Sequence, residues 1–87
     1  MMQSAEMAKI KSLKNNLKTI RQTEGIKKAP LAREARISER SVSRIESEGM
    51  SPSIEMIYRI LNALNKLKSS NREDYKFKDL FPNRRES

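Results

Sequence analysis

The segment SPSIEMIYRILNALN, residues 51–65, constrains the fold most, because its hydrophobic residues repeat at helical spacing. The apolar and aromatic members that share one helical face are Ile54, Ile57, Tyr58, Leu61 and Leu64. Ser51 and Pro52 are typical of a helix start, as N-cap and first helical residue. Such a stripe has to be covered by other elements, and nowhere in the chain do β-branched residues alternate as a strand requires. The 87 residues therefore predict one all-α domain with a modest core.

Three further segments carry helix signals. The first ends near Glu24, where Gly25 supplies a left-handed cap, and its start is open between Ser4 and Lys14. Its apolar residues recur at steps of three and four: Met7, Ile10, Leu13, Leu17 and Ile20. The second helix is expected over Lys28–Ala35, and the third over Glu39–Ser47 with Ser38 as its N-cap. A short helical turn is expected at FKDLFP, residues 77–82.

The composition excludes several classes of protein. The net charge of +8 indicates a polyanionic partner, nucleic acid before anionic lipid. Histidine and cysteine are absent and there are only two glycines, so we predict no catalytic site, cofactor or metal site and no phosphate-cradling loop. There is neither an apolar run of membrane-spanning length nor a secretory signal. We therefore expect a cytoplasmic protein that is not an enzyme and has no membrane partner.

The third predicted helix has a thin apolar spine, Val42 and Ile45, and a wide polar face. Arg40, Ser43 and Arg44 point away from the spine, with Glu39 at the edge. Arginine matches the paired acceptors of guanine in the major groove of DNA, glutamate accepts from cytosine, and serine donates or accepts. Taken alone, these residues fit an ordinary solvated helix face equally well. The short helix and the three-residue turn RIS before them favour a helix-turn-helix.

The chain from about Asn15 to Asn65 resembles the phage-repressor/Cro (lambda-repressor-like, XRE) family of helix-turn-helix domains. The matching stretches are LKTIRQTEGI, LAREARISERSVSRIE and SPSIEMIYRILNALN, with DLF resembling the closing turn. The resemblance implies a compact bundle of about five short helices whose third helix enters the major groove. It also implies an ion pair between Arg21 and Glu46, with Glu46 facing inward. The source would be bacterial, archaeal or phage-encoded.

On these grounds, two groups of residues are predicted to touch double-stranded DNA. The base-contacting residues are Glu39, Arg40, Ser43 and Arg44. The phosphate-contacting residues are Lys27, Lys28, Arg36, Ser38, Ser51 and Ser53, the last two at the start of the fourth helix.

The sequence departs from the family pattern at three places. Lys27-Lys28 replaces the usual threonine-glutamine, which removes a threonine cap from the second helix. Arg36 replaces the usual glycine of the turn, and it is strained if the turn requires positive φ. The polar link after the fourth helix is longer than usual.

We divide the chain into an N-terminal extension (1–14) that lengthens the first helix or binds a partner, a helix-turn-helix core (15–65), a loop with a closing helical turn (66–82) and a flexible tail (83–87). The resemblance implies a homodimer. Its interface is open between the extension and the late aromatic residues; we assign Leu80 and Phe81 to the core of the monomer and leave Tyr75 and Phe77 open. The predicted function is a sequence-specific transcriptional regulator, a repressor. The alternative is an antitoxin that binds a toxin partner and represses its own operon.

Overall fold

The computed structural model describes residues 15–82, which contain five helices and no strand. They are α2 (Leu17–Thr23), α3 (Lys28–Ala35), α4 (Glu39–Glu46), α5 (Ile54–Leu67) and α6 (Phe77–Leu80). The all-α prediction is confirmed. The predictions for 1–14 and 83–87 lie outside the described residues, as do Met7, Ile10 and Leu13.

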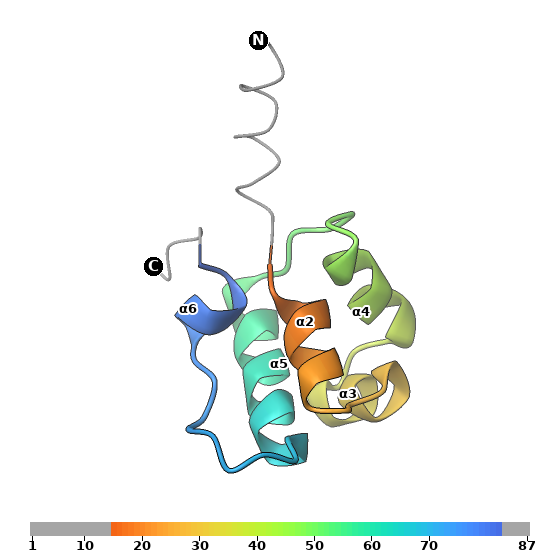
Figure 1. The fold of residues 1–87 in the computed structure, drawn as a ribbon. Helices are drawn as coiled ribbons and strands as arrows, with labels where there is room; N and C mark the ends of the chain where they lie inside the picture. Colours follow the sequence, from red (N-terminus) through yellow and green to blue (C-terminus); the bar gives the residue numbers. More distant parts are fainter. Residues whose placement is uncertain (1–14, 83–87) are drawn as a thin grey trace, which may run out of the picture.

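The helices surround one core. α3 and α4 lie on one side of the bundle and α6 on the other, with α2 and α5 between them (Figure 1). The fully buried side chains come from every helix: Leu17, Leu31, Val42, Ile45, Ile57, Ile60, Leu64 and Leu80. Burial of these apolar stripes is the main force that holds such short helices, because isolated helices of this length are marginal in water.

Three helices end in the same hydrogen-bonded cap, with a left-handed residue just after the helix. After α3 this residue is Arg36, with φ 61°; its N–H donates to Arg33 O and that of Ile37 donates to Ala32 O. This is a Schellman motif, so the turn does require positive φ at Arg36. Gly25 occupies the same position after α2, with φ 69°, and Glu48 after α4, with φ 65°. Two of the three caps therefore carry a side chain where glycine is favoured.

The start of α5 differs from the prediction. Ser53 rather than Ser51 is the N-cap, because its Oγ accepts from Met56 N at 3.1 Å. Pro52, predicted as the first helical residue, is instead buried in the link before the helix. Tyr58, predicted on the apolar face of this helix, is 39% exposed. Its ring contacts that of the buried Phe77, with centroids 6.0 Å apart.

The closing segment, residues 68–81, folds back onto α2 and α5. Phe77, Leu80 and Phe81 are buried in the core of the monomer, which confirms the assignment of the last two and places Phe77 with them. The Asn65 side chain joins α5 to this segment, since it accepts from Tyr75 N and donates to Tyr75 O. The segment is therefore part of the bundle.

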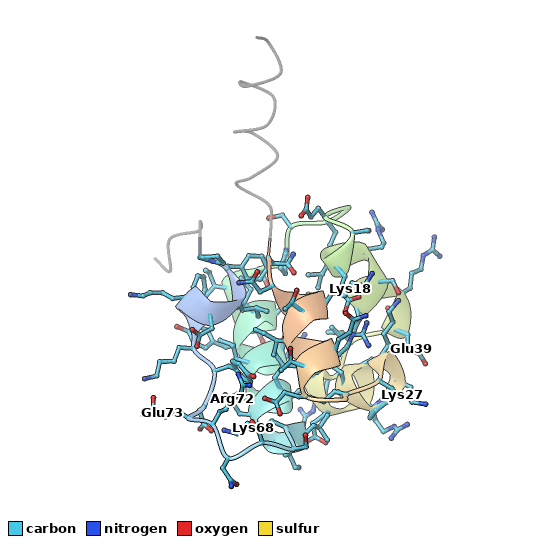
Figure 2. All side chains as sticks on the ribbon, viewed as in Figure 1. Lys18, Lys27, Glu39, Lys68, Arg72 and Glu73 are labelled. Carbon is cyan, nitrogen blue, oxygen red and sulfur yellow. The ribbon has the colours of Figure 1, made fainter. Side chains whose placement is uncertain are left out.

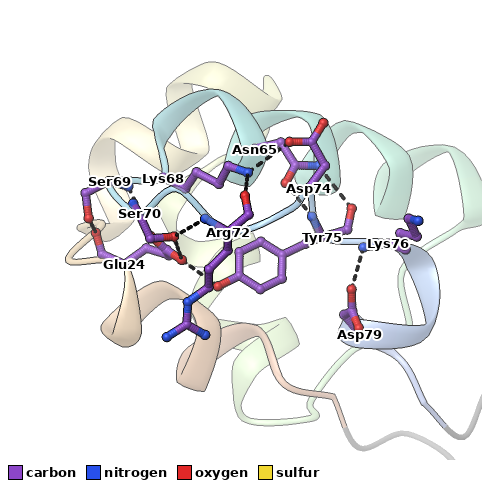
Figure 3. A network of polar contacts seen from close by, with 10 residues as sticks. All are labelled: Glu24, Asn65, Lys68, Ser69, Ser70, Arg72, Asp74, Tyr75, Lys76 and Asp79. Carbon is purple, nitrogen blue, oxygen red and sulfur yellow. Dashed lines mark hydrogen bonds and ion pairs between the residues drawn. The ribbon is translucent and has the colours of Figure 1, made fainter.

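Glu24, at the end of α2, anchors the closing segment (Figure 3). Its side chain is buried, and its carboxylate accepts from Ser69 N and Ser70 N at 3.0 Å, from Ser70 Oγ at 2.9 Å and from the Tyr75 hydroxyl. The Tyr75 hydrogen bond, with those from Ser70 and Ser69, lowers the pKa of Glu24 from 4.5 to about 2 against the opposing effect of burial. The same bond raises the pKa of Tyr75 above its usual 10.0. The half-buried Tyr75 thus has its hydroxyl group engaged within the monomer.

Candidate nucleic-acid interface

α4 presents two faces of opposite character. Val42 and Ile45 are fully buried, whereas Arg40 and Arg44 are exposed on the other side of the helix. Glu39, in the first turn, is exposed as well. The fold therefore has the buried and polar faces that the hydrophobic periodicity predicted. The polar face of α4 is accessible from outside the domain.

The N-terminus of α4 is held by Ser38. Its Oγ accepts from Ser41 N at 3.0 Å, which satisfies one of the backbone donors at the helix start. The Ser38 hydroxyl also lies 3.0 Å from Ser41 Oγ, to which it donates. A phosphate contact from this hydroxyl would therefore replace the bond to Ser41.

The C-terminal half of α4 is tied to α2 by an ion pair. Arg21 Nε lies 2.7 Å from Glu46 Oε2, and Arg21 Nη2 donates to Glu46 Oε1 at 3.2 Å. The two side chains are 12% and 6% exposed, so the pair is largely buried. Arg21 also donates to Ile26 O at 3.0 Å. Glu46 faces the bundle, and the pair sets how α4 lies across α2.

The two lysines that replace the family's threonine-glutamine differ in their surroundings. Lys27 is exposed. It occupies the N-cap position of α3, but its side chain makes no capping hydrogen bond. Lys28 is half-buried, and its Nζ donates to Ser43 Oγ at 3.0 Å. Figure 2 shows Lys27 and Glu39 on the side of the molecule that carries α3 and α4. Lys28, a predicted phosphate contact, is thus bonded to Ser43, a predicted base contact.

Arg44 is partly engaged by its own helix end. Its Nη2 donates to Gly49 O at 3.3 Å, in the loop after α4. No hydrogen bond or ion pair from the Arg40 side chain is found among residues 15–82. Of the two arginines, Arg40 therefore has the freer guanidinium group.

The remaining predicted phosphate contacts lie before and after α4. Arg36 is exposed in the turn before α4, and Ser51 and Ser53 are exposed in the link and cap before α5. The Ser53 Oγ accepts from Met56 N, which leaves its hydroxyl hydrogen for an outside acceptor.

Lys18, in α2, lies near the polar side chains of α4, and it was not predicted as a site residue from the sequence. It lines a hollow of about 330 Å³ together with Lys28, Ser43, Glu46 and Ser47. The predicted Arg21–Glu46 pair could have indicated this position, because it places Arg21 next to α4. Lys18 precedes Arg21 by three residues and therefore lies on the same side of α2, one helical turn away. Figure 2 shows Lys18 beside α4.

A comparison with protein families decides what this arrangement is. The family model described as helix-turn-helix, of the Cro/C1 (XRE) type, matches residues 17–68, more than half of the chain. The chain belongs to this helix-turn-helix family. No curated protein and no solved structure gives a significant match to it.

This helix-turn-helix protein is a lambda-repressor-like domain and is assigned as a DNA-binding transcription regulator. The family is a family of regulatory DNA-binding domains, not of enzymes. Within residues 15–82, no helix is both long and apolar enough to cross a bilayer. In the same part of the chain, no three acidic, histidine or cysteine residues are grouped as metal ligands would be.

Proposed function

We propose that this protein is a sequence-specific repressor that reads double-stranded DNA by placing α4 in the major groove. The observation that supports this most is the outer face of α4, where Arg40 and Arg44 are exposed directly opposite the fully buried Val42 and Ile45. A major groove about 12 Å wide admits one α-helix, and arginine pairs with guanine O6 and N7 there.

In the proposed complex, two groups of residues have separate tasks. Glu39, Arg40, Ser43 and Arg44 contact base edges from α4. Contacts to the phosphates come from the surrounding residues and fix the register: Lys27, Lys28, Arg36, Ser38, Ser51 and Ser53. A cytoplasmic homodimer would read two half-sites about 34 Å apart.

Selection of bound duplexes from a random-sequence pool tests this proposal. We expect a palindromic consensus, which would give both the base preference and the spacing of the half-sites. Neutralisation of four to six phosphates should lower affinity with salt at a log–log slope of roughly −4 to −5. Equal affinity for selected and random duplexes would overturn the base-reading role of α4, because the salt dependence alone is shared by non-specific binders.

A further inference from the structure

We propose that Lys28 fixes the direction of the Ser43 hydroxyl, so that Ser43 selects hydrogen-bond acceptors on the bases and rejects the amino group of cytosine. The inference rests on the proposed function, in which α4 lies in the major groove. It assigns to Lys28 a role in sequence preference as well as its predicted phosphate contact.

The contact lies beside the Arg21–Glu46 ion pair. Lys28 and Ser43 face one hollow, which Glu46 also lines. The carboxylate of Glu46 accepts from Arg21 through both oxygens, and no ion pair between Lys28 and Glu46 is found among residues 15–82. Lys28 Nζ instead donates to Ser43 Oγ at 3.0 Å, and both side chains are half-buried there.

The chemistry of lysine decides which partner donates. An ammonium group has three donors and no acceptor, so the Ser43 oxygen accepts in this bond and its own hydrogen points elsewhere. A serine within a helix often gives that hydrogen to a carbonyl of the preceding turn. Among residues 15–82, no acceptor for the Ser43 hydroxyl hydrogen is found. The hydrogen therefore remains for a group outside the protein.

A serine without this constraint bonds to either kind of base edge. With one lone pair of its oxygen engaged by Lys28, Ser43 offers its hydrogen, which suits guanine O6 and N7, adenine N7 and thymine O4. The cytosine N4 amino group is itself a donor, and the positive charge of Lys28 beside the remaining lone pair disfavours a second donor there. The two other hydrogens of the Lys28 ammonium group are left for a phosphate, so one residue has two separable effects.

The test compares four proteins: the wild type, Lys28→Met, Ser43→Ala and the double variant. Duplex selection with the wild type and with Ser43→Ala identifies the base pair that Ser43 contacts. Affinities are then measured for the selected duplex and for one with cytosine at that position. We expect Lys28→Met to reduce the discrimination against cytosine by about five-fold, the effect of one hydrogen bond. We also expect it to weaken binding to every duplex and to reduce the salt slope by about one.

The double variant separates positioning from charge. In the Ser43→Ala background, Lys28→Met should still weaken binding to all duplexes but should no longer change the ratio between them. Lys27→Met is the matched control, because Lys27 is exposed and has no side-chain bond to α4; it should weaken binding uniformly. Urea unfolding of each variant verifies that it is folded.

Three outcomes would overturn the inference. The first is an unchanged ratio in Lys28→Met, and the second is a change in ratio that persists without the Ser43 hydroxyl. The third is a Ser43→Ala variant with the same base preference as the wild type. The first two leave the proposed function intact, and the third removes only Ser43 from the proposed base-contacting residues. A wild type with no preferred sequence would overturn both proposals.

Discussion

The end of α2 and the outer face of α4 contain the same kinds of polar side chain, but these find their partners in different places. At the end of α2, Arg21 bonds to Glu46 and Glu24 bonds to the closing segment, all inside the domain. On the outer face of α4, Glu39 and Arg40 are exposed. Buried polar groups contribute to stability only when they are paired, whereas exposed ones with no protein partner remain free to bind a ligand.

This difference separates stability from recognition. Substitutions at the end of α2 should lower the free energy of unfolding and leave the DNA preference of the folded protein unchanged. Substitutions on the outer face of α4 should do the reverse. Each experiment below can break that separation.

The largest effect is expected at Glu46. Glu46→Ala leaves the Arg21 guanidinium buried without its carboxylate and should lower the free energy of unfolding by about 3 kcal/mol. Urea denaturation measures this. Glu39→Ala is the matched control, because Glu39 lies in the same helix but is exposed; it should change stability by less than about 0.5 kcal/mol. Similar losses in the two variants would show that the two faces of α4 do not differ as we infer.

The second effect concerns the arginines. Arg40→Ala and Arg44→Ala should each weaken binding to the selected duplex by about 1–3 kcal/mol, with a smaller effect on random DNA. The loss should be smaller for Arg44, because its Nη2 has to leave Gly49 O before it reaches a base.

Arg72→Ala provides the control for charge in these binding titrations. Arg72 is exposed in the closing segment, on the other side of the molecule (Figure 2). An equal loss for Arg72→Ala, or equal losses on selected and random DNA, would contradict base reading by α4.

The third effect is a dependence of stability on pH. The folded-state pKa of Glu24 is about 2, below the 4.5 of the unfolded chain, chiefly because of the Tyr75 hydrogen bond. Its contribution to stability is therefore complete above pH 4.5 and is lost as the pH falls towards 2. Glu24→Gln should lower the melting temperature by roughly 5 °C at pH 7 and flatten its decline in acid.

Thermal unfolding from pH 7 to pH 2 measures this difference. Glu73→Gln, in an exposed part of the closing segment, should follow the wild-type curve. Parallel curves for Glu24→Gln and the wild type would contradict the anchoring role of the Glu24 carboxylate.

The smallest effect is a gain in stability. Arg36→Gly relieves the strain of a side chain at a left-handed backbone position, but it also makes the unfolded chain more flexible. We expect the free energy of unfolding to rise by a net amount of about 0.5 kcal/mol. The variant should nevertheless bind all duplexes more weakly if Arg36 contacts a phosphate. Glu48→Gly, at the equivalent position after α4, should give the same gain in urea unfolding. A loss of stability in both variants would disprove strain at these caps.

The sequence predicted the helices because their signals are local. Apolar spacing placed Val42 and Ile45 inward and Arg40 outward, and Ser38 caps α4 as expected. The boundary of α5 was missed for a physical reason. Both Ser51 and Ser53 have capping side chains, and the path of the chain through the buried Pro52 selects the second.

The candidate site was only partly accessible to sequence reasoning. The base-contacting set follows from one helix face, since its members lie within one and a half turns of the same helix. Lys18 was missed because its position beside α4 depends on how α2 crosses that helix. The anchor at Glu24 was missed as well, because its partners follow it by 45 to 51 residues.

By itself, the amino-acid order determined where helices form, which face of each is apolar, and that the surface is basic. These properties depend on neighbours within a turn or two of the same helix. Only the tertiary structure decided that Lys28 bonds to Ser43 while Arg21 takes Glu46, and that Glu24 holds Tyr75. The competition among these donors and acceptors is settled by the packing of helices far apart in the chain, which sets the distances at which they meet.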